Sequence, residues 1–374
     1  MDFSLSGDQQ DLAALSRRIL GDKVTVEVLR RVEAADARFD REIWEALAHA
    51  GLVGIGLPED LGGGGGGLLE TCLVLEEVGR SLAPVPLLAS AVAGALPIAE
   101  FGDSAQQQAW VRPAADGTRI LTAALSEPAN GDPLQPATRA QPDGDGWRLD
   151  GVKTTVPAGT IADLLVVPAA VGDRVGLFLV EPSTPGVTIT PQRLTTRDSA
   201  GYVEFHHARL DAGALLGSLD EGRRILEWLV ERVTVGLCAQ QLGVIEQALD
   251  ETAAYAKSRV QFERPIATFQ AVGHRCADAY IDVEAARLTL WQALWRLSSG
   301  LPARTEVEVA KFWAAEAGHR VAHTAVHIHG GMGVAVEHTT HRYFLWAKQA
   351  EFMLGGASEQ LVRLGDELAA GAPL

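Results

Sequence analysis

Basic residues are scarce in this 374-residue sequence, which has 32 lysines and arginines against 48 aspartates and glutamates and a net charge of −16. A strongly acidic surface disfavours non-specific binding to nucleic acid or to an anionic membrane. It still permits a local basic pocket for an anionic ligand. We therefore expect neither nucleic acid nor a membrane among the partners.

Cysteine is also scarce, and the three residues present, Cys72, Cys238 and Cys276, lie far apart with no C-x-x-C motif. This pattern excludes a disulfide framework and a cysteine-based zinc site. The sequence also lacks an uncharged apolar run of the roughly 18–20 residues that span a bilayer. The start, "MDFSLSGDQQDLAAL", is acidic and amphipathic, unlike a secretory signal, so we expect a cytoplasmic protein.

The pattern of apolar residues changes twice along the sequence, from helical spacing to short β-rich runs and back. The length of the chain favours two or three packed units. Residues 1–118 have helical apolar spacing, with Ser6 as a candidate N-cap. Residues 119–214 contain short β-rich runs about ten residues apart, separated by Gly, Pro and Asp. Residues 215–374 are helical again. We predict an α+β multidomain protein, with an N-terminal helical domain, a middle antiparallel β-barrel or sandwich, and a C-terminal helical domain.

Six successive glycines, Gly62 to Gly67, interrupt the first helical region. No preceding strand and no G-x-G-x-x-G order supports a phosphate-binding loop there. We interpret the run as a flexible turn rather than as a cofactor loop.

Glu231 and Arg232 stand within an apolar helical run, "ILEWLVERVTVGL". At about 100° per residue, the helical neighbours of Glu231 are mostly apolar. A carboxylate on such a face is poorly hydrated, which raises its pKa and suits a general base. The alternative is an ordinary glutamate at a helix edge, paired with Arg232 or Arg224.

Two stretches nearer the C-terminus offer weaker candidates. "GHRVAHTAVHIHGG" places His319, His323 and His327 on one helical face, but three such positions span about 12 Å, too far to converge on one metal ion. The glycines that follow would let backbone N–H groups approach a ligand. In "AKSRVQFERPIATFQAV", Arg259 offers a guanidinium suited to phosphate oxygens, although it can equally be a surface residue.

Taken together, several segments resemble the acyl-CoA dehydrogenase family over essentially the whole chain. The most specific are "SRVQFERPIATFQAV" and, some 55 residues later, "AVHIHGGMGVAVEH". "GLVGIGLPEDLGG", "RILTAALSEP" and "WRLDGVKTTVPAGTIADLLVV" occur in the family's order. The tail "HRYFLWAKQAEFMLGGASEQL" looks most like actinobacterial members that act on acyl-CoA thioesters from sterol side chains.

The resemblance implies a C-terminal four-helix bundle and an FAD enzyme that oxidises an acyl-CoA to its 2,3-enoyl-CoA. It also implies electron transfer flavoprotein as the acceptor and a tetramer with FAD between subunits. By motif, Arg259, Phe262 and Gln270 would reach the pyrophosphate and adenine side of a neighbour's FAD. The segment from His327 to Gly331, with Gly330, would supply further contacts, and His327 stands where many members have Gln. Ser126 matches the position beside the flavin ring.

Three departures from the family pattern concern the reaction centre. Many members carry the catalytic base in a Y-E-G-T stretch, where "MLGGAS" has Leu354 or Gly355 and no carboxylate. The family's flavin-covering Trp is replaced within Thr155, Val156 and Pro157. The family's A-G-S-D has become "ANGDP". The middle domain therefore lacks residues that the family uses at the flavin, whereas the C-terminal motifs of the flavin site are present.

A minority of the family carries its base on the helix before the R-x-Q-F segment, and Glu231 matches that position. Arg232 then matches the family's neighbouring arginine, close to the substrate. The leading hypothesis is an acyl-CoA dehydrogenase subunit with Glu231 as base. Its alternative is a non-catalytic or half-site subunit of an α2β2 heterotetramer that completes the FAD site of a paired homologue.

Overall fold

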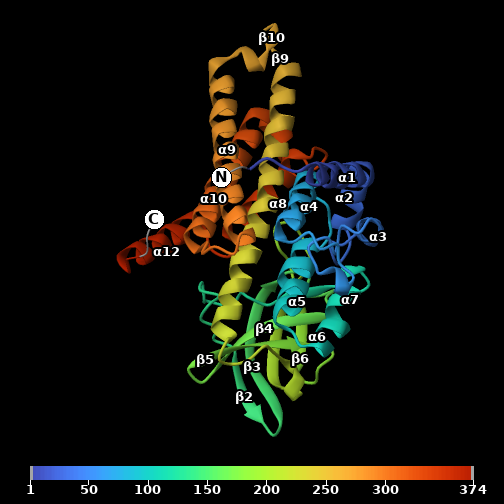
Figure 1. Ribbon diagram of the computed structural model, residues 1–374. Helices are drawn as coiled ribbons and strands as arrows, with labels where there is room; N and C mark the ends of the chain where they lie inside the picture. Colours follow the sequence, from blue (N-terminus) through green and yellow to red (C-terminus); the bar gives the residue numbers. More distant parts are fainter. Residues whose placement is uncertain (1–2, 372–374) are drawn as a thin grey trace. The chain divides into compact units, whose positions relative to one another are not determined.

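The computed structural model describes residues 3–371, which form two compact units, each assembled from separate stretches of the chain. One unit contains the residues up to Val26, Cys72–Ala83 and the chain from Leu237 onward. The other contains Glu27–Thr71 and Pro84–Gly236. Helices, then strands, then helices follow one another along the chain (Figure 1), which confirms the order expected from the sequence. The boundaries of the three expected domains stay a prediction.

The unit of Glu27–Thr71 and Pro84–Gly236, here called the sheet-containing unit, contains short helices and the whole of an eight-stranded sheet. Its helical segments are α2 (Val26–Glu33), α3 (Arg41–His49), η1 (Glu59–Leu61), η2 (Leu88–Ala95), α5 (Leu96–Phe101), α6 (Ser104–Gln106), η3 (Gln107–Val111), α7 (Arg112–Ala115) and η4 (Ala212–Ala214). Its strands are β1 (Leu121–Ala123), β2 (Arg139–Asp143), β3 (Gly146–Val156), β4 (Leu164–Val171), β5 (Arg174–Val180), β6 (Val187–Gln192), β7 (Ala200–Leu210) and β8 (Leu215–Leu216).

The strand order is β6-β7-β3-β2-β4-β5-β8, with β1 beside β4. Most neighbours are antiparallel, as expected, but β1 and β2 each pair with β4 in parallel. The residues between β1 and β4 include the whole β2–β3 hairpin. A connection of that length allows two strands to run in the same direction.

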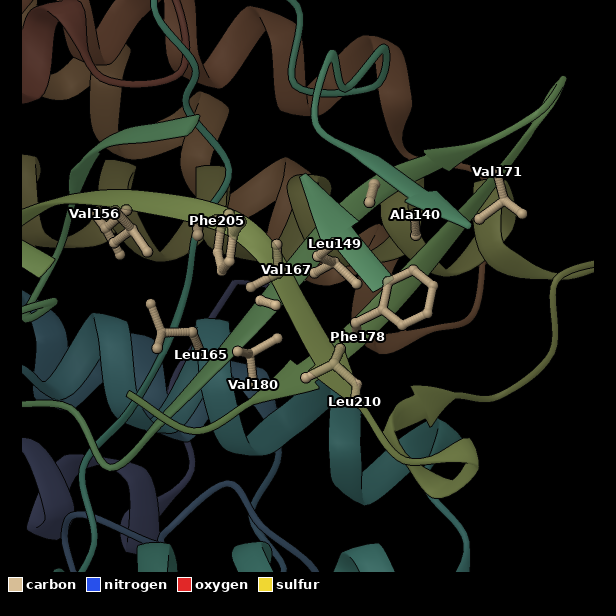
Figure 2. Packing of buried hydrophobic residues seen from close by; sticks show 14 residues of the cluster. Ala140, Leu149, Val156, Leu165, Val167, Val171, Phe178, Val180, Phe205 and Leu210 are labelled. Carbon is tan, nitrogen blue, oxygen red and sulfur yellow. The ribbon is translucent and has the colours of Figure 1, made fainter. Parts of the chain in front are cut away.

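Strand β4 lies at the centre of the sheet because both of its faces are apolar. Its sequence, "LLVVPAAV", is buried at seven of eight positions, as expected for a strand covered on both sides. Phe178, Leu149 and Val167 pack together in the core of the sheet (Figure 2), and all three are fully buried. In contrast, β6 alternates between half-buried and exposed residues, which is typical of an edge strand.

The other unit is a helical bundle. Its elements are α1 (Gly7–Lys23), most of α4 (Leu68–Ser81), the second part of α8 (Gly222–Ser258), β9 (Val260–Gln261), β10 (Arg264–Pro265), η5 (Ile266–Thr268), α9 (Gln270–Ser298), α10 (Arg304–His329), η6 (Gly330–Val334), α11 (Thr340–Phe352) and α12 (Ala357–Ala369). The β9–β10 hairpin joins α8 to α9 (Figure 1).

Local signals explain where some of these helices begin and how closely they pack. The hydroxyl of Ser6 accepts a hydrogen bond from the N–H of Gln9 at 3.2 Å, which confirms the expected cap of α1. Helices α4 and α8 meet at glycines. A Cβ on Gly79 would lie 2.8 Å from the carbonyl carbon of Gln240, and one on Gly243 would lie 2.7 Å from the nitrogen of Arg80. Only glycine permits that approach.

A network of ion pairs crosses the same contact. Arg80 pairs with Glu246, and Arg287 on α9 pairs with the same carboxylate. Arg17 on α1 pairs with Glu77 on α4 at 2.7 Å. The network joins four helices of the bundle. Among residues 3–371, no helix has both the length and the apolar character needed to cross a bilayer.

Candidate active site

Glu231 lies on the part of α8 that belongs to the sheet-containing unit. This stretch contains no proline, and its arginines, leucines and glutamates are good helix formers. The Glu231 side chain is 26% exposed, and its neighbours Thr234 and Val235 on the same face are buried. Glu231 is therefore neither directed into bulk water nor fully enclosed.

Arg232 is the arginine that accompanies Glu231. The distance between Arg232 Nη1 and Glu231 Oε2 is 3.6 Å, and the Arg232 side chain is 16% exposed. Burial lowers the pKa of Arg232 to about 10, while the carboxylates of Glu231 and Glu100 oppose that shift. Arg224 instead pairs with Glu221 at 2.6 Å. Both interpretations of Glu231 place an arginine beside it, so this pairing alone does not decide between them.

Ser126 lies half-buried three residues after the end of β1, next to a buried ion pair. Lys153 Nζ donates to Glu127 Oε1 at 2.6 Å, and the side chains are 1% and 3% exposed. The same carboxylate accepts the backbone N–H of Thr138 at 2.9 Å. Burial opposes ionisation of Glu127, but Lys153 and the backbone N–H groups of Thr138 and Ala137 together outweigh it and hold the pKa of Glu127 at about 2. No local pattern predicts this pair, because its partners are 26 residues apart.

Thr155 and Val156 lie in a strained bulge of β3. The pairing of β3 with β7 shifts register between Lys153 and Val156, and the β-branched Thr155 has φ +49°. Gln192 on β6 holds the bulge in place by accepting the N–H of Thr155 at 2.6 Å. The Ser126 carbonyl accepts the N–H of Thr154 at 2.9 Å. Ser126 and the bulge are therefore fixed to one another.

Arg259, Phe262 and Gln270 all lie in the bundle unit, around the β9–β10 hairpin. Phe262 is in the turn at φ +52° and is 86% exposed. Its ring meets Phe269 edge to face at 6.2 Å. Arg259 is exposed just before β9, and Gln270 begins α9. This hairpin presents an aromatic ring and cationic groups to solvent.

The second motif of the bundle lies where α10 ends. His327 is exposed in the last turn, and Gly330 follows the helix with φ +61° and ψ −137°, which glycine adopts readily. Added Cβ atoms on Gly330 or Gly331 would meet nothing within 4 Å. The backbone here is therefore open to a ligand. His329 is buried and stacks on Tyr255 at 4.3 Å.

The other histidines do not form a metal site in the described part of the chain. The rings of His319 and His323 lie 4.5 Å apart, and His319 Nδ1 lies 3.0 Å from Lys348 Nζ. Among residues 3–371, no group of three His, Cys, Asp or Glu side chains could hold an ion.

Within each unit, the structure joins the predicted residues only in part. It pairs Glu231 with Arg232, whereas the ring of Phe262 contacts Phe269, a residue with no predicted role. Sequence reasoning missed Trp228, whose ring lies directly under the Arg232 guanidinium. The available signal was the spacing W-x-x-x-R, which places both side chains on one side of a helix.

The fold and three family matches define the class of this protein. Family models for acyl-CoA dehydrogenase match along the chain: the N-terminal domain at residues 6–118, the middle domain at 122–209 and the C-terminal domain at 220–367. The chain belongs to the acyl-CoA dehydrogenase family. It is an oxidoreductase of the CH–CH group of acyl-CoA thioesters, and members of this family are flavoproteins.

Individual relatives are similar over nearly their whole length. The chain is 46% identical to acyl-CoA dehydrogenase FadE27 of Mycobacterium tuberculosis, over 99% of each chain. It is 46% identical to a chain in the crystal structure of the ChsE4-ChsE5 complex from Mycobacterium tuberculosis, covering 99% of each with a TM-score of 0.94. A structure of a Tcur3481-Tcur3483 steroid ACAD variant is 45% identical over 98% of each, with a TM-score of 0.92.

Proposed function

We propose that this chain is a subunit of an FAD-dependent acyl-CoA dehydrogenase in which Glu231 removes the α-proton of the thioester. The observation that carries this assignment is a half-buried carboxylate, 3.6 Å from a largely buried guanidinium, at the helix position of a minority of family members. The loop that bears the base in other members has no carboxylate here, since it reads "MLGGAS".

The bundle residues fit a flavin dinucleotide. Arg259 would pair with the pyrophosphate of a neighbouring subunit's FAD, and the exposed ring of Phe262, with Gln270, would hold the adenine side of that FAD. His327, Gly330 and Gly331 would offer further contacts through an open backbone, as the free space around both glycines allows. Ser126, in the sheet-containing unit, would lie beside a flavin ring. When bound, FAD supplies the acceptor for the β-hydride.

The residues of this chain have distinct tasks in the reaction. Glu231 accepts the α-proton in its carboxylate form. Arg232 favours that form, because an opposite charge at this distance lowers the pKa of a carboxylic acid. Partial burial limits hydration of the carboxylate and thus strengthens its interaction with a proton donor. Arg232 would also lie near the thioester.

The substrate that we propose is a bulky acyl-CoA derived from a sterol side chain, with electron transfer flavoprotein as the electron acceptor and the cytoplasm as the location. Similarity to the Tcur3481-Tcur3483 steroid ACAD supports the substrate class. Turnover of a sterol-derived acyl-CoA should then exceed that of a straight-chain acyl-CoA of equal carbon number.

Replacing Glu231 with Gln tests the base directly. The amide cannot accept the α-proton, so we expect dye reduction by acyl-CoA to fall by roughly 100-fold or more, while the flavin absorbance of the purified holoenzyme is retained. Glu227→Gln is the matched control, since Glu227 is one turn earlier on α8, 41% exposed, and 4.0 Å from Arg223. Unchanged turnover in Glu231→Gln would refute the assignment.

A second candidate is a half-site subunit that completes the FAD site of a paired homologue in an α2β2 assembly. The bulge at Thr155 favours it, because this segment carries no aromatic ring where the family has its Trp. The ChsE4-ChsE5 similarity also supports it, since that structure is a complex of two proteins. The two candidates differ in whether the chain retains flavin without a partner.

A further inference from the structure

Trp228 is the centre of an aromatic and cationic stack within the sheet-containing unit. The Arg232 guanidinium carbon lies 3.8 Å from the centroid of the Trp228 ring. Phe101 on α5 meets Trp228 edge to face, with centroids 5.0 Å apart and an interplanar angle of 82°. Arg224 lies over Phe101 at 5.1 Å. In these four residues, here called the Trp228 stack, two adjoining rings lie between two cations.

The stack restricts Arg232 in two ways. The guanidinium lies on the face of the indole, the strongest aromatic partner for a cation. Arg232 Nη1 also donates to the Trp228 backbone carbonyl at 3.1 Å. Both contacts direct the side chain back toward the preceding helical turn. An arginine normally samples many rotamers, and this one is confined to the side of the helix that faces Glu231.

Trp228 is itself held in place by its neighbours. Its edge-to-face contact with Phe101 joins α8 to α5, and such a contact contributes about 0.5–1.5 kcal/mol beyond area burial. The charged groups near the stack are few. Glu231 and Glu100 attract Arg232 electrostatically. Arg224 pairs with Glu221, and Arg223 lies 4.0 Å from Glu227. Within this set, Arg232 is the cation beside Glu231.

We propose that Trp228 is a positioning residue of the dehydrogenase reaction: its ring fixes Arg232 beside Glu231, so that the carboxylate works next to an immobile positive charge. This inference rests on the proposed role of Glu231 as base. If Trp228 only filled space, another apolar side chain would serve, and the environment of Glu231 would not depend on its ring.

The two interpretations differ in the pH dependence of the reaction. A fixed Arg232, 3.6 Å from Glu231, favours the ionised carboxylate. Without the ring, Arg232 gains mobility and water, so ionisation of Glu231 becomes less favourable. The acid limb of kcat/KM reports the base of the free enzyme and therefore moves to higher pH. For Trp228→Leu we expect a shift of roughly 0.5–1 pH unit, part of the 1–3 units that a nearby opposite charge produces.

The chain offers a closely matched control in Trp313 on α10. It is also half-buried, meets Phe312 edge to face at 5.6 Å and lies under Arg320 at 5.9 Å. Trp313→Leu therefore removes a similar stack from the bundle unit. We expect it to lower the melting temperature without moving the acid limb. Trp228→Phe retains a ring and should fall between wild type and Trp228→Leu.

The experiment measures kcat/KM against pH for the assembled holoenzyme carrying each variant, alone and combined with Arg232→Lys. In the Arg232→Lys background, Trp228→Leu should add no further shift, since the ring acts through the guanidinium. Near-UV circular dichroism of the resting protein gives a readout independent of turnover. The Trp228 band, taken as wild type minus Trp228→Leu, should shrink in Arg232→Lys.

Each outcome has a defined meaning. An upward shift in Trp228→Leu that Arg232→Lys abolishes supports the positioning role. An acid limb unchanged from wild type, with only the stability loss seen in Trp313→Leu, overturns it. Full turnover in Glu231→Gln refutes the base assignment instead. Loss of activity in Glu231→Gln with no shift in Trp228→Leu refutes only the inference about Trp228.

Discussion

Gly63 shows how a single missing side chain shapes this fold. Its N–H donates to the carbonyl of Pro58 at 2.9 Å, and a Cβ at this position would lie 2.5 Å from the carbonyl carbon of Leu57. Neighbouring glycines bond in the same way, Gly64 to Gly54 and Gly66 to Ile55, each at 2.9 Å. The run is a bonded, close-packed turn, unlike the flexible turn that its composition favoured.

Gly63→Ala should therefore destabilise the protein. The added methyl must displace backbone, so we expect a loss of roughly 1–3 kcal/mol in the free energy of unfolding. Gly213→Ala is the control, because a Cβ there meets nothing within 4 Å. Urea denaturation of both variants measures the difference. Equal free energies of unfolding for the two variants would contradict this account, because they would show that the turn accommodates the methyl group.

The sequence predicts whether a residue is buried or exposed better than it predicts which residues its side chain contacts. Helical periodicity correctly placed Glu231 near buried Thr234 and Val235. It could not show that Arg232 turns back onto Trp228, because that depends on a rotamer and on Phe101, which is more than 100 residues away. The buried pair of Glu127 and Lys153 escaped notice for the same reason.

At the scale of elements, local patterns predicted strands that have apolar character of their own. The β-rich runs expected between residues 119 and 214 include "GWRLDGVKTTV", "ADLLVVPAA", "RVGLFLVEP" and "GYVEFHHARL", which form β3, β4, β5 and β7. Strand β2 was not, because "RAQPD" is polar and contains Pro142, and it exists through its pairing with β3. The parallel neighbours of β4 were also missed, since strand order depends on contacts distant in sequence.

Helix α12 depends on an ionisable contact with α10. Glu308 on α10 and Glu367 on α12 share Arg304, which lies 3.6 Å from Glu308 and pairs with Glu367. Glu308 Oε2 is buried without a hydrogen-bond partner. Burial and then repulsion from Glu367 raise the pKa of Glu308 to about 7, against the attraction of Arg304.

This raised pKa makes the folded state less stable at alkaline pH. The native protein binds the Glu308 proton more tightly than the unfolded chain, so stability declines between about pH 4.5 and 7. Above the pKa of Glu308 in the folded protein, the stabilisation that its bound proton provides is fully lost. Glu308→Gln should remove about 1–2 kcal/mol of that decline. Urea unfolding at pH 5.5 and 8 measures it, with Glu316→Gln as the control on α10, because Glu316 pairs with Arg320 at 3.3 Å and is half-buried. A decline equal to wild type in Glu308→Gln would contradict this account.

For the whole molecule, the exposed apolar side chains are unevenly distributed. Within residues 3–371, the large hydrophobic residues that are exposed all fall between positions 260 and 368, in the bundle unit. They are Val260, Phe262, Tyr280, Ile281, Leu288, Leu301, Met332, Val334, Val336, Phe352, Leu361, Val362 and Leu368. We expect part of this exposed apolar surface to be covered when subunits assemble. The family resemblance places FAD between subunits, so assembly and flavin binding should be coupled.

Flavin occupancy with and without a partner then decides between the two proposed functions. If the chain is a half-site subunit, protein purified alone should be colourless and folded. Co-expression with a paired homologue that supplies the missing Trp should restore flavin absorbance in a complex of both chains. If the chain is a complete catalytic subunit, it should be yellow when purified alone.

The control is Arg259→Ala in the co-expressed chain. Removing the proposed pyrophosphate contact should lower flavin content while circular dichroism stays unchanged, because Arg259 is exposed and buries no apolar surface. Absorbance at the flavin maximum, divided by protein concentration, measures occupancy. Full occupancy in the lone chain would eliminate the half-site function. A complex with a partner that gains no flavin would eliminate the coupling between assembly and cofactor binding.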